Sequence, residues 1–280
     1  HRDLHSFPTR RSSDLIGELE YELFQQLKTE INSNTRRVQQ TANDIAVADT
    51  LAGLAFVAEN NHYVRPSLHP LEAPRKLFLK DSRHPVIEQI DLGEVFVPND
   101  LDMEESKCRI MLITGPNMAG KSTYMRQVAL IVLMAQCGSF VPVSSSEFSV
   151  VDRIFTRVGA SDNLTLGQST FMLEMNEAAA ILNNATERSL IILDEIGRGT
   201  STFDGISIAW AIVEYIQKLS ALTLCATHYH ELTAIAQELD SVKNFSIRVE
   251  EEGEKIVFLR KIVSGEADKK IGRASCRERV

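Results

Sequence analysis

Apolar residues recur at three- and four-residue steps in the first part of the chain, at Ile16, Leu19, Leu23, Leu27 and Ile31. This spacing predicts an amphipathic helix. The polar run Asn32-Ser33-Asn34 predicts an interruption, after which a second periodic stretch continues from Val38 to Ala55. Asn60-Asn61-His62 predicts its end, before two prolines. We expect two packed helices here, and none of their residues indicates chemistry.

Beyond Pro74 the pattern changes to short apolar runs that alternate with longer helical stretches. The apolar runs predict strands at 77–79, 110–114, 190–193 and 222–226. Helices are predicted at 121–136, 169–185 and 205–218, and a serine-rich loop at 144–146. Buried strands that alternate with helices predict an α/β fold with a parallel sheet.

Composition narrows the class of protein. The chain has 280 residues, of which 44% are hydrophobic and 24% charged, as in ordinary soluble globular proteins. Its net charge of −8 argues against broad neutralisation of nucleic-acid phosphates. The longest uninterrupted apolar run, 128–135, is far shorter than a bilayer span. The four cysteines form no CxxC pair and no Cys/His cluster, so we expect a reduced, cytosolic chain with no zinc site and no disulfide framework.

The two ends differ from the middle. Residues 1–15 are basic and rich in Ser and Arg, lack the apolar core of a secretory signal, and resemble translated sequencing-adapter read-through, as do residues 273–280. We interpret both as non-native tails; genuine disordered tails are the alternative. Three Arg against two Asp in the first, and three Arg against one Glu in the second, leave −11 on residues 16–272.

A phosphate-binding loop is predicted between a strand and a helix. Gly115-Pro116-Asn117-Met118-Ala119-Gly120-Lys121-Ser122 fits the pattern GxxxxGK[ST]. In this pattern backbone N–H groups and a helix N-terminus surround the phosphates, Lys121 adds a positive charge, and the Ser122 hydroxyl binds Mg²⁺. An ordinary glycine-containing turn is the alternative, but the loop stands where the mechanism requires.

Acidic residues end a second buried strand, and a histidine follows a third. Asp194 and Glu195 come directly after Leu190-Ile191-Ile192-Leu193. With the phosphate loop upstream, Asp194 is the candidate metal ligand and Glu195 the candidate general base. His228 follows the strand 222–226, where it could contact the γ-phosphate or its attacking water. A loop histidine without function is the alternative.

Five blocks of the chain resemble the MutS family of DNA mismatch-repair ATPases. They are residues 113–127, 152–162, 169–175, 194–202 and 226–229. The resemblance covers about residues 16–272 and fits the bacterial repair branch best. It implies a P-loop NTPase of the ABC-ATPase type, preceded by a short helical segment, that hydrolyses ATP with Mg²⁺.

The resemblance also implies roles for individual residues. Nucleotide contacts are implied for Phe96, Gly115, Pro116, Asn117, Met118, Ala119, Gly120, Lys121, Ser122, Thr123 and Ser169. Phe96 matches the aromatic residue that stacks on adenine, with a core Phe as the alternative. Ser169 matches the signature motif that approaches the γ-phosphate from the other protomer of a dimer; by itself it would be an ordinary N-cap. His228 matches the family's switch histidine.

The resemblance further implies the domain organisation and the partners. Residues 16–75 correspond to the end of the lever and core region that joins the ATPase to the DNA clamp, and residues 76–272 to the ATPase domain. The chain has no Phe-x-Glu motif, with which the family reads mismatches. By the same resemblance, we expect this sequence to lack most of the clamp and the C-terminal helix-turn-helix. We expect the full-length protein to be a homodimer in the bacterial cytoplasm, associated with the nucleoid and with no membrane. It would bind mismatched double-stranded DNA through the missing domains and act with MutL-like repair proteins.

Three alternatives differ in class. The paralogous MutS family with a nuclease tail acts outside mismatch repair, and Met118 favours the repair branch. Transporter or chromosome-condensation ABC ATPases carry a Leu-Ser-Gly-Gly type signature, where this chain has Ser169-Thr170-Phe171-Met172. The third alternative is a non-catalytic nucleotide-binding scaffold, and the argument against it is that Lys121, Ser122, Asp194 and Glu195 are all intact.

Overall fold

The computed structural model describes residues 7–70, 72–90, 96–116, 119–158, 170–252 and 255–265. Its chain divides into two compact units, His1–Phe56 and Val57–Val280, which are described separately below. Residues 273–280 of the expected C-terminal tail lie outside the described residues, as do the first six residues of the expected N-terminal tail.

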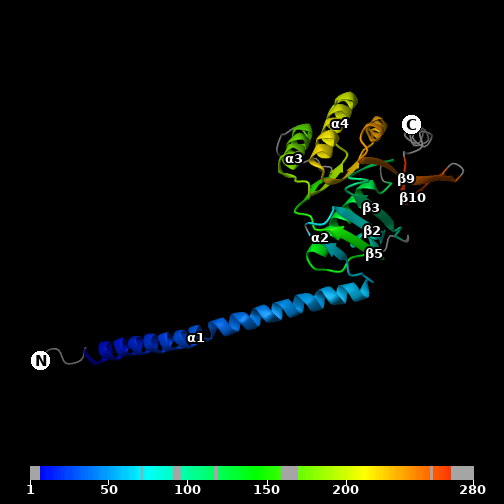
Figure 1. Ribbon diagram of the computed structural model, residues 1–280. Helices are drawn as coiled ribbons and strands as arrows, with labels where there is room; N and C mark the ends of the chain where they lie inside the picture. Colours follow the sequence, from blue (N-terminus) through cyan, green and yellow to red (C-terminus); the bar gives the residue numbers. More distant parts are fainter. Residues whose placement is uncertain are drawn as a thin grey trace. The chain divides into compact units, whose positions relative to one another are not determined.

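One helix, α1 (Phe7–Asn60), accounts for the first unit (Figure 1). The expected interruption at 32–34 is wrong, because the helix continues through it. The Ser33 hydroxyl and the Asn34 side-chain amide both donate to the Glu30 carbonyl, at 2.7 and 3.0 Å. These side chains bond to the preceding turn and so leave the helical backbone intact. The helix also begins at Phe7, within the segment interpreted as a tail.

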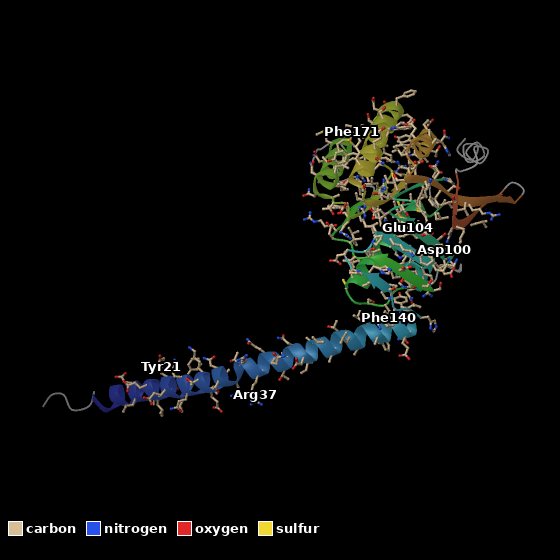
Figure 2. The ribbon with its side chains drawn as sticks, in the orientation of Figure 1. Tyr21, Arg37, Asp100, Glu104, Phe140 and Phe171 are labelled. Atoms are coloured by element: carbon tan, nitrogen blue, oxygen red, sulfur yellow. The ribbon has the colours of Figure 1, made fainter. Side chains whose placement is uncertain are left out.

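Most of the large apolar side chains described in α1 are exposed, which contradicts the expectation of two helices packed on each other. Leu19, Leu23, Leu27 and Ile31 are each more than half exposed, as is Tyr21 (Figure 2). By length and composition alone, the part of α1 within Asp14–Asn60 could cross a membrane, a test that core helices of soluble proteins also pass. Asp44 and Asp49 oppose that use, since a charged residue at a bilayer centre costs about 2.5–3.5 kcal/mol.

A six-stranded sheet forms the centre of the second unit. Its strand order is β10 (Lys255–Ser264), β9 (Val242–Glu252), β4 (Ile110–Thr114), β8 (Leu222–Ala226), β7 (Leu190–Asp194) and β6 (Ile154–Arg157). All neighbouring strands are parallel except β9 and β10. Every residue of β4, β7 and β8 is buried, which confirms the strands predicted from these three near-continuous apolar runs.

Helices cover both faces of this sheet. Met111 and Ile113 of β4 belong to a core that includes α2 (Lys121–Gln136), whereas Ile110 and Leu112 face a second core. The second core includes α3 (Thr170–Asn184), α4 (Thr202–Leu219) and the short helices η3 (His230–Ala234) and α5 (Ile235–Glu238). Figure 1 shows α3 and α4 side by side, away from α2. This arrangement confirms the predicted α/β class with a mainly parallel sheet.

A four-stranded sheet packs with α2 in the first of these cores. Its order is β1 (Ser67–His69), β5 (Ser145–Ser149), β2 (Lys76–Ser82) and β3 (Asn99–Glu104). A short helix, η1 (Ile87–Gln89), lies between β2 and β3 in the sequence. The loop expected at 144–146 is wrong in part, because Ser145 begins β5 and pairs with Lys80. Phe148, which is fully buried, anchors β5 in the core.

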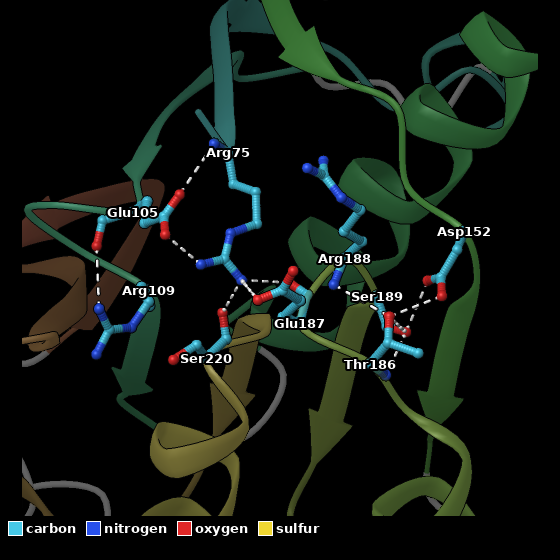
Figure 3. Close-up of polar contacts among 9 residues, drawn as sticks. All are labelled: Arg75, Glu105, Arg109, Asp152, Thr186, Glu187, Arg188, Ser189 and Ser220. Carbon is cyan, nitrogen blue, oxygen red and sulfur yellow. Dashed lines mark hydrogen bonds and ion pairs between the residues drawn. The ribbon is translucent and has the colours of Figure 1, made fainter. Parts of the chain in front are cut away.

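Arg75 joins the two sheets at the end where the central parallel strands begin. Its guanidinium forms an ion pair with Glu105 and donates to the carbonyls of Glu187 and Ser220, at 2.7 and 2.9 Å (Figure 3). Glu187 lies just before β7, and Ser220 is the C-cap of α4. This polar cluster ties the amino ends of the strands together, opposite the edge where the candidate site lies.

His84 gives the second unit a predictable pH dependence. Burial, together with the charge of Arg126, lowers its pKa, and its Nδ1 accepts hydrogen bonds from the Val86 and Ile87 N–H groups. Below about pH 6.5 the unfolded chain binds a proton that the folded chain does not, so the free energy of unfolding decreases as the pH is lowered. We predict that the melting temperature falls less between pH 7.5 and 5.5 in His84→Asn than in wild type. The exposed His230, changed to Asn, is the control; an equal fall in the His84 variant and wild type would contradict the prediction.

Candidate nucleotide-binding site

Three segments leave the central sheet at the same level. Ile113 of β4 pairs with Ala226 of β8, which pairs with Asp194 of β7, so these residues form one row across the sheet. The Thr227 N–H donates to the Ile113 carbonyl, and the Glu195 N–H donates to the Ala226 carbonyl, each at 3.0 Å. With about 4.8 Å between neighbouring strands, the glycine loop and the two acidic residues start about 10 Å apart.

The glycine loop turns into α2 through two residues with positive φ. Gly115 has φ +140° and Gly120 has φ +108°, a region that residues with a Cβ rarely adopt. Gly120 is the N-cap of α2 and has no side chain that could cap the first N–H groups of the helix. The N-cap residue thus leaves the first N–H groups of α2 available to an anion. Asn117 and Met118 lie outside the described residues.

Lys121 is folded over this loop. Its side chain is buried, with the residue only 4% exposed, and its Nζ donates to the carbonyls of Gly115 and Pro116 at 2.6 and 2.9 Å. Burial lowers the pKa of the ammonium, while the charges of Glu195 and Asp194 act in the opposite direction. The positive charge of the loop is thus within electrostatic reach of both acidic residues. Ser122 and Thr123 follow in the first turn of α2 and are partly buried.

The two acidic residues have different environments. Asp194 is buried, and its Oδ1 has no hydrogen-bond partner among the described residues. Glu195 has φ +56°, unusual for a residue with a side chain, and its Oε2 lies 2.7 Å from Arg198 Nη1. An unpartnered buried carboxylate oxygen is costly without a cation, so Asp194 is suited to bind a metal, whereas Glu195 already has a cationic partner in Arg198.

His228 follows β8 and lies near Glu195. Partial burial lowers the pKa of its imidazole, and the negative charge of Glu195 opposes that shift. The ring centroid lies 4.1 Å from that of Tyr229, whose hydroxyl is hydrogen bonded to the Gly197 carbonyl at 2.8 Å. The residue as a whole is exposed. Its position at this edge is the one expected from the sequence.

The other two expected residues are less closely tied to this row. Phe96 is partly exposed, and the contacts of its segment run to β10: Lys261 donates to the Pro98 carbonyl, and Asn99 bonds the backbone of Arg260 and Ile262. The described hydrogen bonds do not join Phe96 to the glycine loop. Ser169 lies outside the described residues, and α3 begins just after it at Thr170.

Sequence reasoning assigned no role to several residues around Glu195. Glu174 accepts a hydrogen bond from the Gly197 N–H, and Arg157 and Tyr229 are buried beside the same turn. One signal was present in the sequence: Glu174, Ala178 and Ile181 are spaced by one helical turn, so a charged residue occupies the buried face of α3.

Comparison with known proteins places the chain among mismatch-repair proteins. It is 56% identical over 264 residues to DNA mismatch repair protein MutS from Lachnoclostridium phytofermentans, covering 93% of this chain and 28% of that protein. Identity is also 56% with the proteins of the same name from Acetivibrio thermocellus and Clostridioides difficile, again over 93% of this chain, and over 30% and 27% of theirs. The chain therefore spans less than a third of the length of these relatives. Residues 111–277, which include the glycine loop, both acidic residues and His228, match MutS domain V, and the chain belongs to that family.

Proposed function

We propose that this chain is the ATP-binding and ATP-hydrolysing module of a bacterial mismatch-repair MutS protein, built as an ABC-type P-loop ATPase. The observation that carries the proposal is the row of strand ends, which gathers Lys121, Asp194 and Glu195 from segments far apart in the chain. The identity to proteins named DNA mismatch repair protein MutS supports the cellular role.

Binding rests on the glycine loop and the amino end of α2. The backbone N–H groups of residues 115–120 and the helix dipole attract the phosphates. On binding, the Lys121 ammonium exchanges the carbonyls of Gly115 and Pro116 for phosphate oxygens, which are stronger acceptors because they are charged. Thr123 would contact the phosphates from the first turn of α2, and Phe96 would stack on the adenine.

Mg²⁺ fits the residues at this edge. Asp194 offers a buried oxygen with no hydrogen-bond partner among the described residues, and Ser122 offers a hydroxyl. Within the part of the chain that the structure describes, no group of three His, Cys, Asp or Glu forms a cage for a metal. This suits Mg²⁺, which binds through one or two carboxylates together with substrate phosphates. When bound, Mg²⁺ neutralises charge on the phosphate oxygens.

Hydrolysis then depends on Glu195 and His228. Glu195 accepts a proton from the attacking water while the oxygen of that water bonds to the γ-phosphorus. The bond from the γ-phosphorus to the bridging oxygen of the β-phosphate breaks, which releases ADP and phosphate. In this structure Glu195 Oε2 is paired with Arg198, so that oxygen becomes available to the attacking water only when the pair separates. His228 would contact the γ-phosphate from the end of β8.

The remaining assignments complete this proposal. Residues 16–75 would be the end of the lever and core region, residues 76–272 the ATPase domain, and residues 1–15 and 273–280 non-native tails. Ser169 would contact the γ-phosphate bound by a second copy. In the full-length homodimer, nucleotide state would control binding of mismatched DNA by other domains and recruit MutL-like proteins in the bacterial cytoplasm, at the nucleoid.

Lys121→Ala should weaken ATP binding at least about tenfold, because hydrogen bonds from a charged donor contribute about 1.5–3 kcal/mol. A fluorescent-nucleotide titration measures the dissociation constant. Lys107→Ala, which removes an exposed ammonium remote from the loop, is the matched control and should bind like wild type. Unchanged affinity in Lys121→Ala would remove the phosphate-loop assignment.

Glu195→Gln should bind Mg²⁺-ATP like wild type and lower kcat by about a hundredfold or more, because it keeps the shape but removes the base. Steady-state phosphate release measures turnover, with the exposed Glu238→Gln as control. Asp194→Asn should instead raise the Mg²⁺ concentration needed for half-maximal activity. Turnover of Glu195→Gln within about twofold of wild type would show that another group is the base.

Assembly gives a further prediction. If Ser169 acts across a dimer, specific ATPase activity should rise with protein concentration, because mass action completes each site. Ser169→Ala mixed in equal amounts with Glu195→Gln should recover up to about one quarter of wild-type activity, because half of the dimers are mixed and each holds one intact site. Specific activity independent of concentration, with no recovery in the mixture, would show that each chain completes its own site.

A further inference from the structure

In the turn that follows Glu195, both backbone polar groups of Gly197 are hydrogen bonded to side chains. The Gly197 N–H donates a hydrogen bond to Glu174 Oε1, and the Gly197 carbonyl accepts one from the Tyr229 hydroxyl at 2.8 Å. Glu174 belongs to α3, and Tyr229 follows β8 next to His228. Gly197 is therefore fixed by two side chains from opposite sides of the turn.

Close packing prevents this turn from moving away. Gly197 has φ +90°, and a Cβ at this position would lie 2.6 Å from the Gly205 carbonyl oxygen. The backbone of α4 is thus in direct contact with the turn. A displacement of Gly197 requires movement of α4 or loss of one of the two side-chain hydrogen bonds.

Glu174 is an unusual residue for its position. It is only 3% exposed and lies on the face of α3 that also buries Ala178 and Ile181, where an apolar side chain would pack without loss. Its second oxygen is 3.7 Å from Arg157 Nη2, a buried guanidinium that also lies 2.9 Å from Glu177 through its Nε. The charge is compensated by Arg157, and the Gly197 N–H is the group that Glu174 contacts at the site.

The geometry explains why Glu195 needs such support. At φ +56° its backbone is in the left-handed region, which costs a residue with a side chain about 1–2 kcal/mol. Strained backbone of this kind persists only when its surroundings enforce it. Gly197 lies two residues after Glu195, and its hydrogen bonds to Glu174 and Tyr229 fix the path of the chain there. To follow this path, Glu195 adopts the left-handed conformation.

We propose that Glu174 is a positioning residue for Glu195, an inference that rests on the function proposed above. By holding Gly197, Glu174 keeps the Glu195 carboxylate at the edge of the sheet where the attacking water must lie. Because Glu174 is on α3, the same bond makes the position of Glu195 depend on the position of that helix. Tyr229 holds the turn from the other side and so relates it to His228.

The test compares Glu174→Ala, Glu174→Gln and Glu177→Ala in the full chain at one protein concentration. Glu177 also pairs with Arg157 but is 43% exposed and does not contact Gly197, so it is the matched control. We expect Glu174→Ala to lower kcat roughly 10- to 100-fold, as misplacement by about 1 Å does, with the dissociation constant for ATP within about twofold of wild type. Glu174→Gln keeps an acceptor oxygen and should recover part of the loss, whereas Glu177→Ala should turn over like wild type.

Thermal unfolding of each variant shows whether it is folded. If Glu174→Ala does not fold, Tyr229→Phe takes its place, since it removes only the hydroxyl that donates to Gly197, and it should lower kcat in the same way. An unchanged kcat in the folded variant, or an equal loss in Glu177→Ala, would overturn the positioning role and leave the proposed function standing. A wild-type chain that binds no ATP and shows no turnover at any protein concentration would overturn the proposed function and this inference with it.

Discussion

Hydrogen-bonded register across three buried strands is the constraint on which the rest of the second unit depends. Ile113, Ala226 and Asp194 occupy one row, so segments far apart in the chain leave the sheet at one level. A shift of one residue in β7 would exchange its two buried faces and turn Asp194 to the other side of the sheet. Because apolar layers cover both faces, packing opposes such a shift at every residue of the strand. The position of the acidic pair is therefore a consequence of the core.

The buried charged groups at this edge of the sheet are compensated by their neighbours to different degrees. Lys121 is almost fully buried, yet its ammonium has two loop carbonyls as acceptors and two carboxylates within electrostatic reach. Among the described residues, Asp194 Oδ1 has no hydrogen-bond partner. The site is thus better satisfied on its cationic side than on its anionic side, which is the asymmetry expected where a cation and an anionic substrate bind together. Lys121 is thus already held over the phosphate loop by the carbonyls of Gly115 and Pro116.

What the sequence could predict depended on how each element is buried. The strands ending at Thr114, Asp194 and Ala226 are buried on both faces, so their apolar runs were visible without a structure. The first residues of β5 were taken for a loop because Ser145 and Ser146 belong to a run of serines, although Ser146 is buried in the strand. Strands β9 and β10 were missed because charged residues interrupt them. The continuity of α1 through 32–34 depends on side-chain bonds to Glu30, which residue propensities do not reveal.

Glu174 shows a different limit of sequence reasoning. Its partner is a backbone N–H, which leaves no mark in the identity of the residue it contacts, so no pair of side chains could suggest the bond. The visible sign was only a carboxylate in the buried stripe of α3. A contact of this kind has a mechanical consequence that a side-chain pair lacks: only one partner, the Glu174 side chain, can change rotamer to absorb a displacement of the helix, because the other partner is the main chain. Movement of α3 beyond the reach of the Glu174 side chain must therefore either break this bond or move the backbone that carries Glu195.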